Sequence, residues 1–227
     1  MGLDLDQWRA VLDYLLALDT ADGVGSPKRG RYSRADRVAV TTNAADLTLL
    51  QATTGLRIDE ALGLTWADMD QIKADQVKRG RLKADDDTLY VPVWEGRAKT
   101  GRARAFPVAV EPVAQRLRER RANAPSLESP VIGAPADPSK SWDSSNASKA
   151  VRKLYIQMAE QLSIGDLFVQ RSHVWRATLN GLVISENVPV EIRAAWFGHS
   201  PDVNQSAYTD IHDPAPMADA LSRLYTR

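Results

Sequence analysis

Apolar side chains recur three or four positions apart over most of this chain, a spacing that places them on one face of a helix. The pattern predicts a helix within residues 3–19, with Asp4 or Asp6 as its cap, and a second over 36–53, ended by Gly55. Further helices are predicted at 56–64, 110–124, 144–162, 172–187, 188–197, 201–208 and 214–225.

Prolines and small polar residues fit the starts of several of these helices. Pro112, Pro189 and Pro201 stand at or near first turns, where the missing N–H costs no hydrogen bond. A Ser or Asn within Ser144–Asn146 is expected to cap the helix at 144–162. Loops are predicted at 23–34, 71–87 and 125–141.

One region has the period of a β-strand. TLYVPVW at 88–94 alternates in hydrophobicity, and GRAKTGRARAFPV at 96–108 predicts two short strands around the turn Lys99–Arg102. The predicted fold class is therefore α+β and mostly helical, with a helical body that covers one face of a small three-stranded antiparallel sheet.

Composition indicates an ordinary globular chain and excludes several kinds of site. Of 227 residues, 44% are apolar and 26% are charged, which suits one domain over 1–227. The absence of cysteine excludes disulfides, thiolate zinc sites and cysteine nucleophiles. With three histidines and no HExxH pair, we expect neither a metal site nor a cofactor.

The amino terminus and the apolar runs bear on localisation. MGLDLDQW is acidic and lacks the apolar core of a signal peptide. No apolar run approaches the roughly 18 residues of a membrane span. We therefore expect a cytoplasmic protein with no membrane partner.

The charges are unevenly distributed although the formal net charge is zero. A neutral total argues against a nucleic-acid partner. However, RAKTGRAR at 97–104 carries four cations and no acid, and 28–37 carries five cations against Asp36. A neutral chain can thus present a basic face. The candidate DNA-binding cations are Arg97, Arg102 and Arg104.

Two cations in the first half of the chain are candidates for phosphate chemistry. Arg57, in LRIDE after a glycine, is either a surface partner of Glu60 or an arginine held by Glu60 and aimed at a phosphate, whose oxygens match the guanidinium fork. Lys99, at the predicted hairpin tip, is either a solvated turn residue or an ammonium that protonates a leaving oxygen.

The second half adds two more pairs. His173 and Arg176 in HVWR lie on one face at a helix start, where anions are favoured; they are otherwise a capping histidine and an exposed arginine. His199 follows Gly198 at a helix break and Tyr208 lies on the next predicted helix, and both have packing as the ordinary explanation. Core positions are expected for Trp175, Trp196 and Phe197.

The order and spacing of these residues are more specific than any one of them. They stand in TTGLRIDEALGLTWADMD (53–70), AKTGRARAFPV (98–108), HVWRATLNGLVI (173–184) and WFGHSPDVNQSAYTDI (196–211). In this arrangement the chain resembles the catalytic domain of the tyrosine recombinases, the phage-integrase family. The resemblance covers nearly the whole chain.

The resemblance implies how the phosphate would be held. Arg57 and Arg176 would clamp the non-bridging oxygens of the scissile phosphate, and His199 would hydrogen-bond it. Glu60 matches the family's acidic position after the first arginine and would orient the site. These fixed donors can stabilise a phosphoryl transition state without a metal.

It also implies the proton transfers and the nucleophile. Tyr208 would attack phosphorus and form a 3′-phosphotyrosyl link, His173 would assist as a base, and Lys99 would be the general acid for the 5′-hydroxyl. The implied function is site-specific DNA recombination or integration, without ATP, in a bacterial host cell. The implied partners are double-stranded DNA and, on DNA, three further copies of the chain in a tetramer; without DNA a monomer is expected.

Some features depart from the family pattern. Ala177 follows Arg176 where many relatives have His, Trp196-Phe197 replace the usual aliphatic pair, and the stretch 71–87 is long. Three alternatives stay open: a type IB topoisomerase-like nicking-closing enzyme, a non-catalytic helical DNA-binding module, and a protein-interaction domain without a DNA role.

Both ends of the chain carry a further expectation. The family usually has an N-terminal helical core-binding domain, which is absent here, so we expect a fragment that binds DNA weakly and non-specifically. The helix at about 214–225 has an apolar stripe of Met217, Leu221 and Leu224. This stripe is expected to dock either on a neighbouring protomer or on its own body.

Overall fold

The computed structural model describes residues 2–25, 32–83, 85–97, 103–170, 172–186, 188–198 and 215–226. In these ranges the chain is mostly helical, with a small amount of antiparallel sheet, as predicted. The helices are α1 (Leu5–Ala17), α2 (Arg34–Thr54), α3 (Ile58–Leu62), α4 (Trp66–Lys78), α5 (Glu111–Ala122), α6 (Ser144–Leu162), α7 (Val174–Ser185), α8 (Val190–Phe197) and α9 (Ala215–Thr226).

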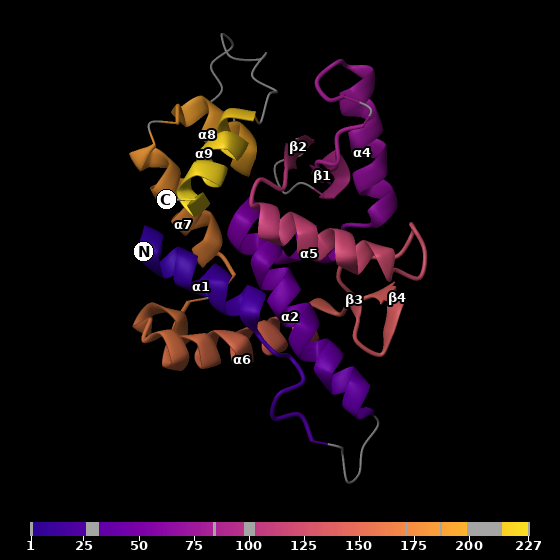
Figure 1. The fold of residues 1–227 in the computed structure, drawn as a ribbon, viewed down its shortest axis with the longest axis vertical. Coiled ribbons are helices and arrows are strands. Elements are labelled where there is room, and N and C mark those ends of the chain that lie inside the picture. Colours follow the sequence, from indigo (N-terminus) through magenta and orange to yellow (C-terminus); the bar gives the residue numbers. More distant parts are fainter. Residues whose placement is uncertain are drawn as a thin grey trace.

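Helix α2 is the centre of the molecule. It contacts α1, α5, α6 and α7, and Figure 1 shows it running diagonally through the body between them. Its second half is buried on every side, so even Thr48 and Thr53 are fully covered and donate to helix carbonyls four residues earlier. This central position fixes the end of α2, at Gly55, inside the molecule.

The sheet differs from the prediction. Strand β1 (Tyr90–Val93) pairs with β2 (Arg104–Pro107) in a two-stranded antiparallel sheet, with Val91 opposite Phe106. The expected third strand is wrong within the described residues, because the chain after β1 winds into a 3-10 turn at Glu95–Arg97 instead. The turn Lys99–Arg102 lies outside the described residues.

A second hairpin stands where a loop was predicted. Strands β3 (Gly133–Ala134) and β4 (Asp137–Ser141) pair antiparallel within the stretch 125–141. Gly133 permits this pairing, because a Cβ at this position would lie 2.2 Å from the carbonyl oxygen of Pro138. A strand of two residues carries no alternation, so the sequence pattern gave no sign of it.

The predicted loop at 71–87 is wrong over its first half, which belongs to α4. Thr65 and Asp68 form a capping box at its start, a local signal that favours a helix. Its buried positions are Trp66, Met69, Ile72 and Gln76. The buried Gln76 interrupts the apolar periodicity, and for this reason the sequence did not show the pattern of a helix here.

Several predicted helix ends are confirmed. Asp4 caps α1, and Gly55 ends α2 in the left-handed conformation with a φ of 71°. The cap of α6 is Asp143 rather than a Ser or Asn, and its carboxylate accepts from the backbone N–H of Asn146 at 2.9 Å. Asp143 precedes the predicted caps by one residue, and an aspartate is as good an acceptor there.

The C-terminal helix docks on its own chain. Met217, Leu221 and Leu224 are buried, and α9 contacts α7, α8 and β2. In Figure 1 α7, α8 and α9 form one group, and α7 lies next to α1. Arg9 joins the first and last helices, since its Nε donates to the carbonyl of Leu224 at 2.7 Å. The apolar side chains of this stripe are therefore buried against other parts of the described chain.

Candidate functional site

The turn between α2 and α3 is the centre of the candidate site. Gly55 has a positive φ and lies against the ring of Phe197, so that a Cβ at Gly55 would lie 2.6 Å from a ring carbon. The indole Nε1 of Trp196 donates to the carbonyl of Thr54 at 2.9 Å. These contacts hold the end of α8 against the end of α2, although the two are far apart in sequence.

Arg57 and Glu60 form the first part of the site. Glu60 is buried on α3, and its Oε2 accepts from the backbone N–H of Arg57 at 2.9 Å. Its Oε1 accepts from NH1 of Arg57 at 3.0 Å. The side chain of Arg57 is 23% exposed, so the guanidinium is anchored at one end and open at the other.

Arg104 approaches the same carboxylate from β2. Its NH2 donates to Oε2 of Glu60 at 2.9 Å, and its side chain is 7% exposed. Arg104 lies two positions before Phe106, which stacks on Trp196 with ring centroids 4.5 Å apart. Residues two apart on a strand share a face, so Arg104 turns inward with Phe106.

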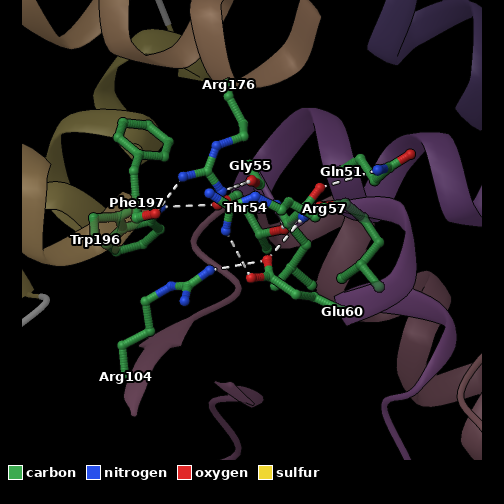
Figure 2. A network of polar contacts seen from close by, with 11 residues as sticks. Gln51, Thr54, Gly55, Arg57, Glu60, Arg104, Arg176, Trp196 and Phe197 are labelled. Atoms are coloured by element: carbon green, nitrogen blue, oxygen red, sulfur yellow. Dashed lines mark hydrogen bonds and ion pairs between the residues drawn. The ribbon is translucent and has the colours of Figure 1, made fainter. Parts of the chain in front are cut away.

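Arg176 enters from the first turn of α7. Its NH1 donates to the carbonyl of Gly55 at 2.9 Å, and its NH2 donates to the carbonyl of Phe197. Its guanidinium carbon lies 5.3 Å from the centre of the Phe197 ring. Figure 2 shows Arg176 reaching the turn at Gly55, while Arg104 and Arg57 both contact Glu60.

Burial and neighbouring charges shift the pKa values of Arg176, Arg104 and Glu60. Burial, followed by repulsion from Arg57 and Arg104, lowers the pKa of Arg176 to about 10, so it stays charged at neutral pH. Burial also lowers the pKa of Arg104. At Glu60 burial opposes ionisation, but Arg104 and the N–H and guanidinium of Arg57 outweigh it and lower the pKa of the carboxyl.

This cluster is suited to bind an anion. It holds three guanidinium groups. Within the described residues Arg57 and Arg104 share Glu60, and Arg176 donates to backbone carbonyls, which leaves an excess of positive charge in a part-buried position. Buried cations without a partner are costly, so an anionic ligand that fits here gains strongly from them. Guanidinium groups match the oxygens of phosphate or carboxylate.

The structure brings together part of the predicted constellation. Arg57, Glu60 and Arg176 meet at one turn, as their proposed roles require, and Arg104 joins them although it was expected on a DNA-binding surface. His173 is exposed on the turn that precedes α7. The predicted site residues Lys99, Arg102, His199 and Tyr208 and the side chain of Arg97 lie outside the described residues.

Two groups of the site were missed at the level of sequence. They are the carbonyls of Gly55 and Phe197, which orient the guanidinium of Arg176. Backbone groups carry no residue-type signal. Gly55 was the one sign in the sequence that a helix would end there and that its last backbone groups could contact other segments.

Removing the carboxylate should destabilise the fold. We expect Glu60→Gln to lower the free energy of unfolding by about 3–5 kcal/mol, because it leaves buried arginine charge without its partner. Urea denaturation at neutral pH measures this change. Asp59→Asn, on the same helix but exposed, is the control and should stay within about 0.5 kcal/mol of the unaltered chain. A Glu60→Gln change no larger than that of the control would contradict the role of Glu60.

A second network of charged side chains, centred on the buried Asp46, stabilises the fold. Asp46 on α2 accepts from Arg116 at 2.5 Å and from Arg120 at 2.6 Å. Arg120 also donates through Nε to Val131 and through NH2 to Asn43. All three nitrogens of Arg120 are therefore engaged, and the network ties the segment before β3 to the helical body.

Comparisons with known proteins give no match from which the role of the site could be inferred. No protein-family model, no curated protein and no solved structure matches the chain. Across the described ranges, no three His, Asp or Glu side chains gather in a way that could hold a metal ion. Within the same residues, no helix combines the length and apolar composition needed to cross a membrane.

Proposed function

We propose that this chain is the catalytic domain of a tyrosine recombinase, which cleaves and rejoins DNA strands through a 3′-phosphotyrosyl intermediate. One observation carries the proposal. Arg57 and Arg176, which the resemblance gives as the two phosphate-clamping arginines, meet at the turn between α2 and α3: Arg57 lies in this turn and binds Glu60 of α3, and Arg176 donates to the carbonyl of Gly55. Two arginines fixed by carboxylate and carbonyl partners form a preorganised cradle for a phosphodiester.

The proposed reaction is a phosphoryl transfer that conserves bond energy. The hydroxyl oxygen of Tyr208 attacks phosphorus, the P–O5′ bond breaks, and the 5′-oxygen leaves with a proton from Lys99. His173 accepts the tyrosine proton, and His199 hydrogen-bonds the phosphate. Attack by another 5′-hydroxyl reverses these steps and reseals the strand, so no ATP is consumed. Arg57 and Arg176 stabilise the charge that builds on the equatorial oxygens.

Two of the described tyrosines, Tyr155 and Tyr225, are poor candidates for the nucleophile. Tyr155 is fully buried, and burial raises the pKa of its phenol. Burial and then the neighbouring Asp13 raise the pKa of Tyr225, which is the opposite of what activates a phenol. A nucleophile needs cations beside it.

The proposed partners follow from the same chemistry. Double-stranded DNA is the substrate, bound through phosphate contacts and therefore in a salt-dependent manner. We propose a monomer without DNA and a tetramer on recombining DNA. The burial of the α9 stripe within the chain agrees with a monomer in the free state.

The test is covalent capture of DNA. The chain is incubated with a pool of randomised duplexes, each nicked so that the short 5′-hydroxyl fragment diffuses away after cleavage. We expect an adduct that survives denaturation, with the 3′-phosphate attached to Tyr208 in peptide mass spectra. No adduct, or attachment to another residue, would refute the proposal. Relaxation of a supercoiled plasmid that lacks the selected sequence would instead favour the topoisomerase-like alternative.

A further inference from the structure

The turn that leads from α2 to Arg57 is hydrogen-bonded along its whole backbone. Three peptide groups join Thr54 to Arg57, and the N–H of each has an acceptor close by in the sequence. In chain order these acceptors are the carbonyl of Gln51 at 2.8 Å, the hydroxyl of Thr54 at 3.3 Å and the carboxylate of Glu60 at 2.9 Å. The N–H side of the turn is therefore held by residues of α2 and α3.

The carbonyls of the same three peptide groups, at residues 54–56, all accept hydrogen bonds from side chains. In chain order the donors are Nε1 of Trp196 at 2.9 Å, NH1 of Arg176 at 2.9 Å and Nε2 of Gln51 at 3.0 Å. Figure 2 shows the three donors around the turn. Because the turn contains Gly55, with a φ of 71°, side-chain sterics restrict its backbone little, and these partners fix its conformation.

Trp196 connects this turn with two other elements. It lies in the last turn of α8, 142 residues from Thr54, and its side chain is buried. Its indole also stacks on Phe106 of β2, with ring centroids 4.5 Å apart. The next residue, Phe197, accepts a hydrogen bond from Arg176 through its carbonyl. Trp196 thus joins the end of α2 to the helix end that holds the guanidinium of Arg176.

We propose that Trp196 is a positioning residue for the two arginines of the site. Its N–H fixes the carbonyl of Thr54 and thereby the backbone from which Arg57 projects toward Arg176. The buried indole acts through this backbone and not on the phosphate itself. A misplacement of about 1 Å can slow a reaction about 10²-fold, so two arginines that share one phosphate depend on such a support. The link to catalysis rests on the proposed function.

Trp8 provides a matched comparison. It is fully buried on α1, and its Nε1 donates to the carbonyl of Ala52 on α2, also at 2.9 Å. Phenylalanine at residue 8 or 196 keeps an aromatic ring and removes the N–H. Both substitutions remove a buried hydrogen bond and should lower the Tm. Only Trp196→Phe releases a carbonyl of the turn itself.

The first measurement is native-state amide hydrogen exchange in the full chain, followed by NMR for the unaltered chain, Trp196→Phe and Trp8→Phe. The change in global stability, measured by urea denaturation, is subtracted. We expect the amides of residues 55–57 to exchange at least about tenfold faster in Trp196→Phe and within about twofold of the unaltered chain in Trp8→Phe. An equal rise in both variants, or no rise in Trp196→Phe, would overturn the inference.

The second measurement is the single-turnover rate of adduct formation at saturating protein, at a temperature below the Tm of every variant. We expect Trp196→Phe to slow the reaction about tenfold, with a DNA dissociation constant within about threefold, because binding draws on many phosphate contacts. Trp8→Phe should change neither value. Equal rates in the two variants would make Trp196 purely structural and overturn the inference. If the unaltered chain forms no adduct, recombination is rejected, and amide exchange alone decides whether Trp196 positions Arg57.

Gln51→Met loosens the same turn from within α2 and decides the matter if Trp196→Phe does not fold. Gln51 is fully buried, and within the described residues its Oε1 has no hydrogen-bond partner. Methionine is also unbranched and fills a similar space, but it cannot donate to the carbonyl of Leu56. We expect the same selective rise in amide exchange at residues 55–57. An unchanged exchange there would show that the turn keeps its conformation without its carbonyl donors, which would overturn the inference.

Discussion

Replacing Tyr208 with phenylalanine should abolish the covalent protein–DNA adduct and leave DNA binding intact. Phenylalanine keeps the ring and removes the oxygen that attacks phosphorus. The contacts of Arg57 with Glu60 and of Arg176 with Gly55, which form the proposed phosphate cradle, do not involve Tyr208, so we expect the DNA still to bind. The expected result is a complete loss of the denaturation-resistant band, with an unchanged mobility shift on the same duplex.

The matched control is Tyr225→Phe. Tyr225 lies on α9 beside Asp13, with a raised pKa, and should be dispensable for cleavage. An adduct that persists in Tyr208→Phe but vanishes in Tyr225→Phe would reverse the assignment. An adduct that persists in both variants would show that the chain uses a nucleophile other than these two tyrosines.

Arg176→Gln should lower the rate of adduct formation by about 10²–10³-fold, the cost of removing one fixed donor from a developing negative charge. The loss is electrostatic, because glutamine can still donate to a carbonyl of Gly55 or Phe197 but carries no charge. Single-turnover cleavage of the suicide duplex at saturating protein measures it, and circular dichroism confirms the fold.

Arg193→Gln serves as the control for Arg176. Arg193 lies on α8 and, like Arg176, donates to a backbone carbonyl, that of Val188 at 3.0 Å. It also donates to Asn180 at 3.1 Å and contributes no charge to the Glu60 cluster. Its substitution should leave the cleavage rate within about threefold, since structural surface contacts of this kind contribute little. Equal losses in both variants would assign Arg176 to packing.

Local signals explain the parts of the site that were predictable. Arg57 and Glu60 stand three apart after a glycine, and the structure pairs them directly. Arg176 was recognised by its place in HVWR at a helix start. Each of these signals lies within a few residues, so no knowledge of the fold was needed to select them.

Other parts of the site depend on contacts between distant segments. Arg104 was expected on a basic surface because its neighbours in RAKTGRAR are cations. Its true orientation follows from the pairing of β2 with β1 and from the stacking of Phe106 on Trp196. A run of charged residues does not indicate which side chain points inward. The alternation of side chains along β2 and its pairing with β1 determine this.

The sequence by itself determined the helical body, the glycine at the end of α2 and the aromatic core positions. These depend on periodicity, backbone conformation and residue type, which are local properties. The tertiary structure decided the two hairpins and the docking of α9 on its own chain. It also decided that Arg104 joins Arg57 and Arg176 around Glu60, since a shared carboxylate is a product of long-range packing that no local pattern encodes.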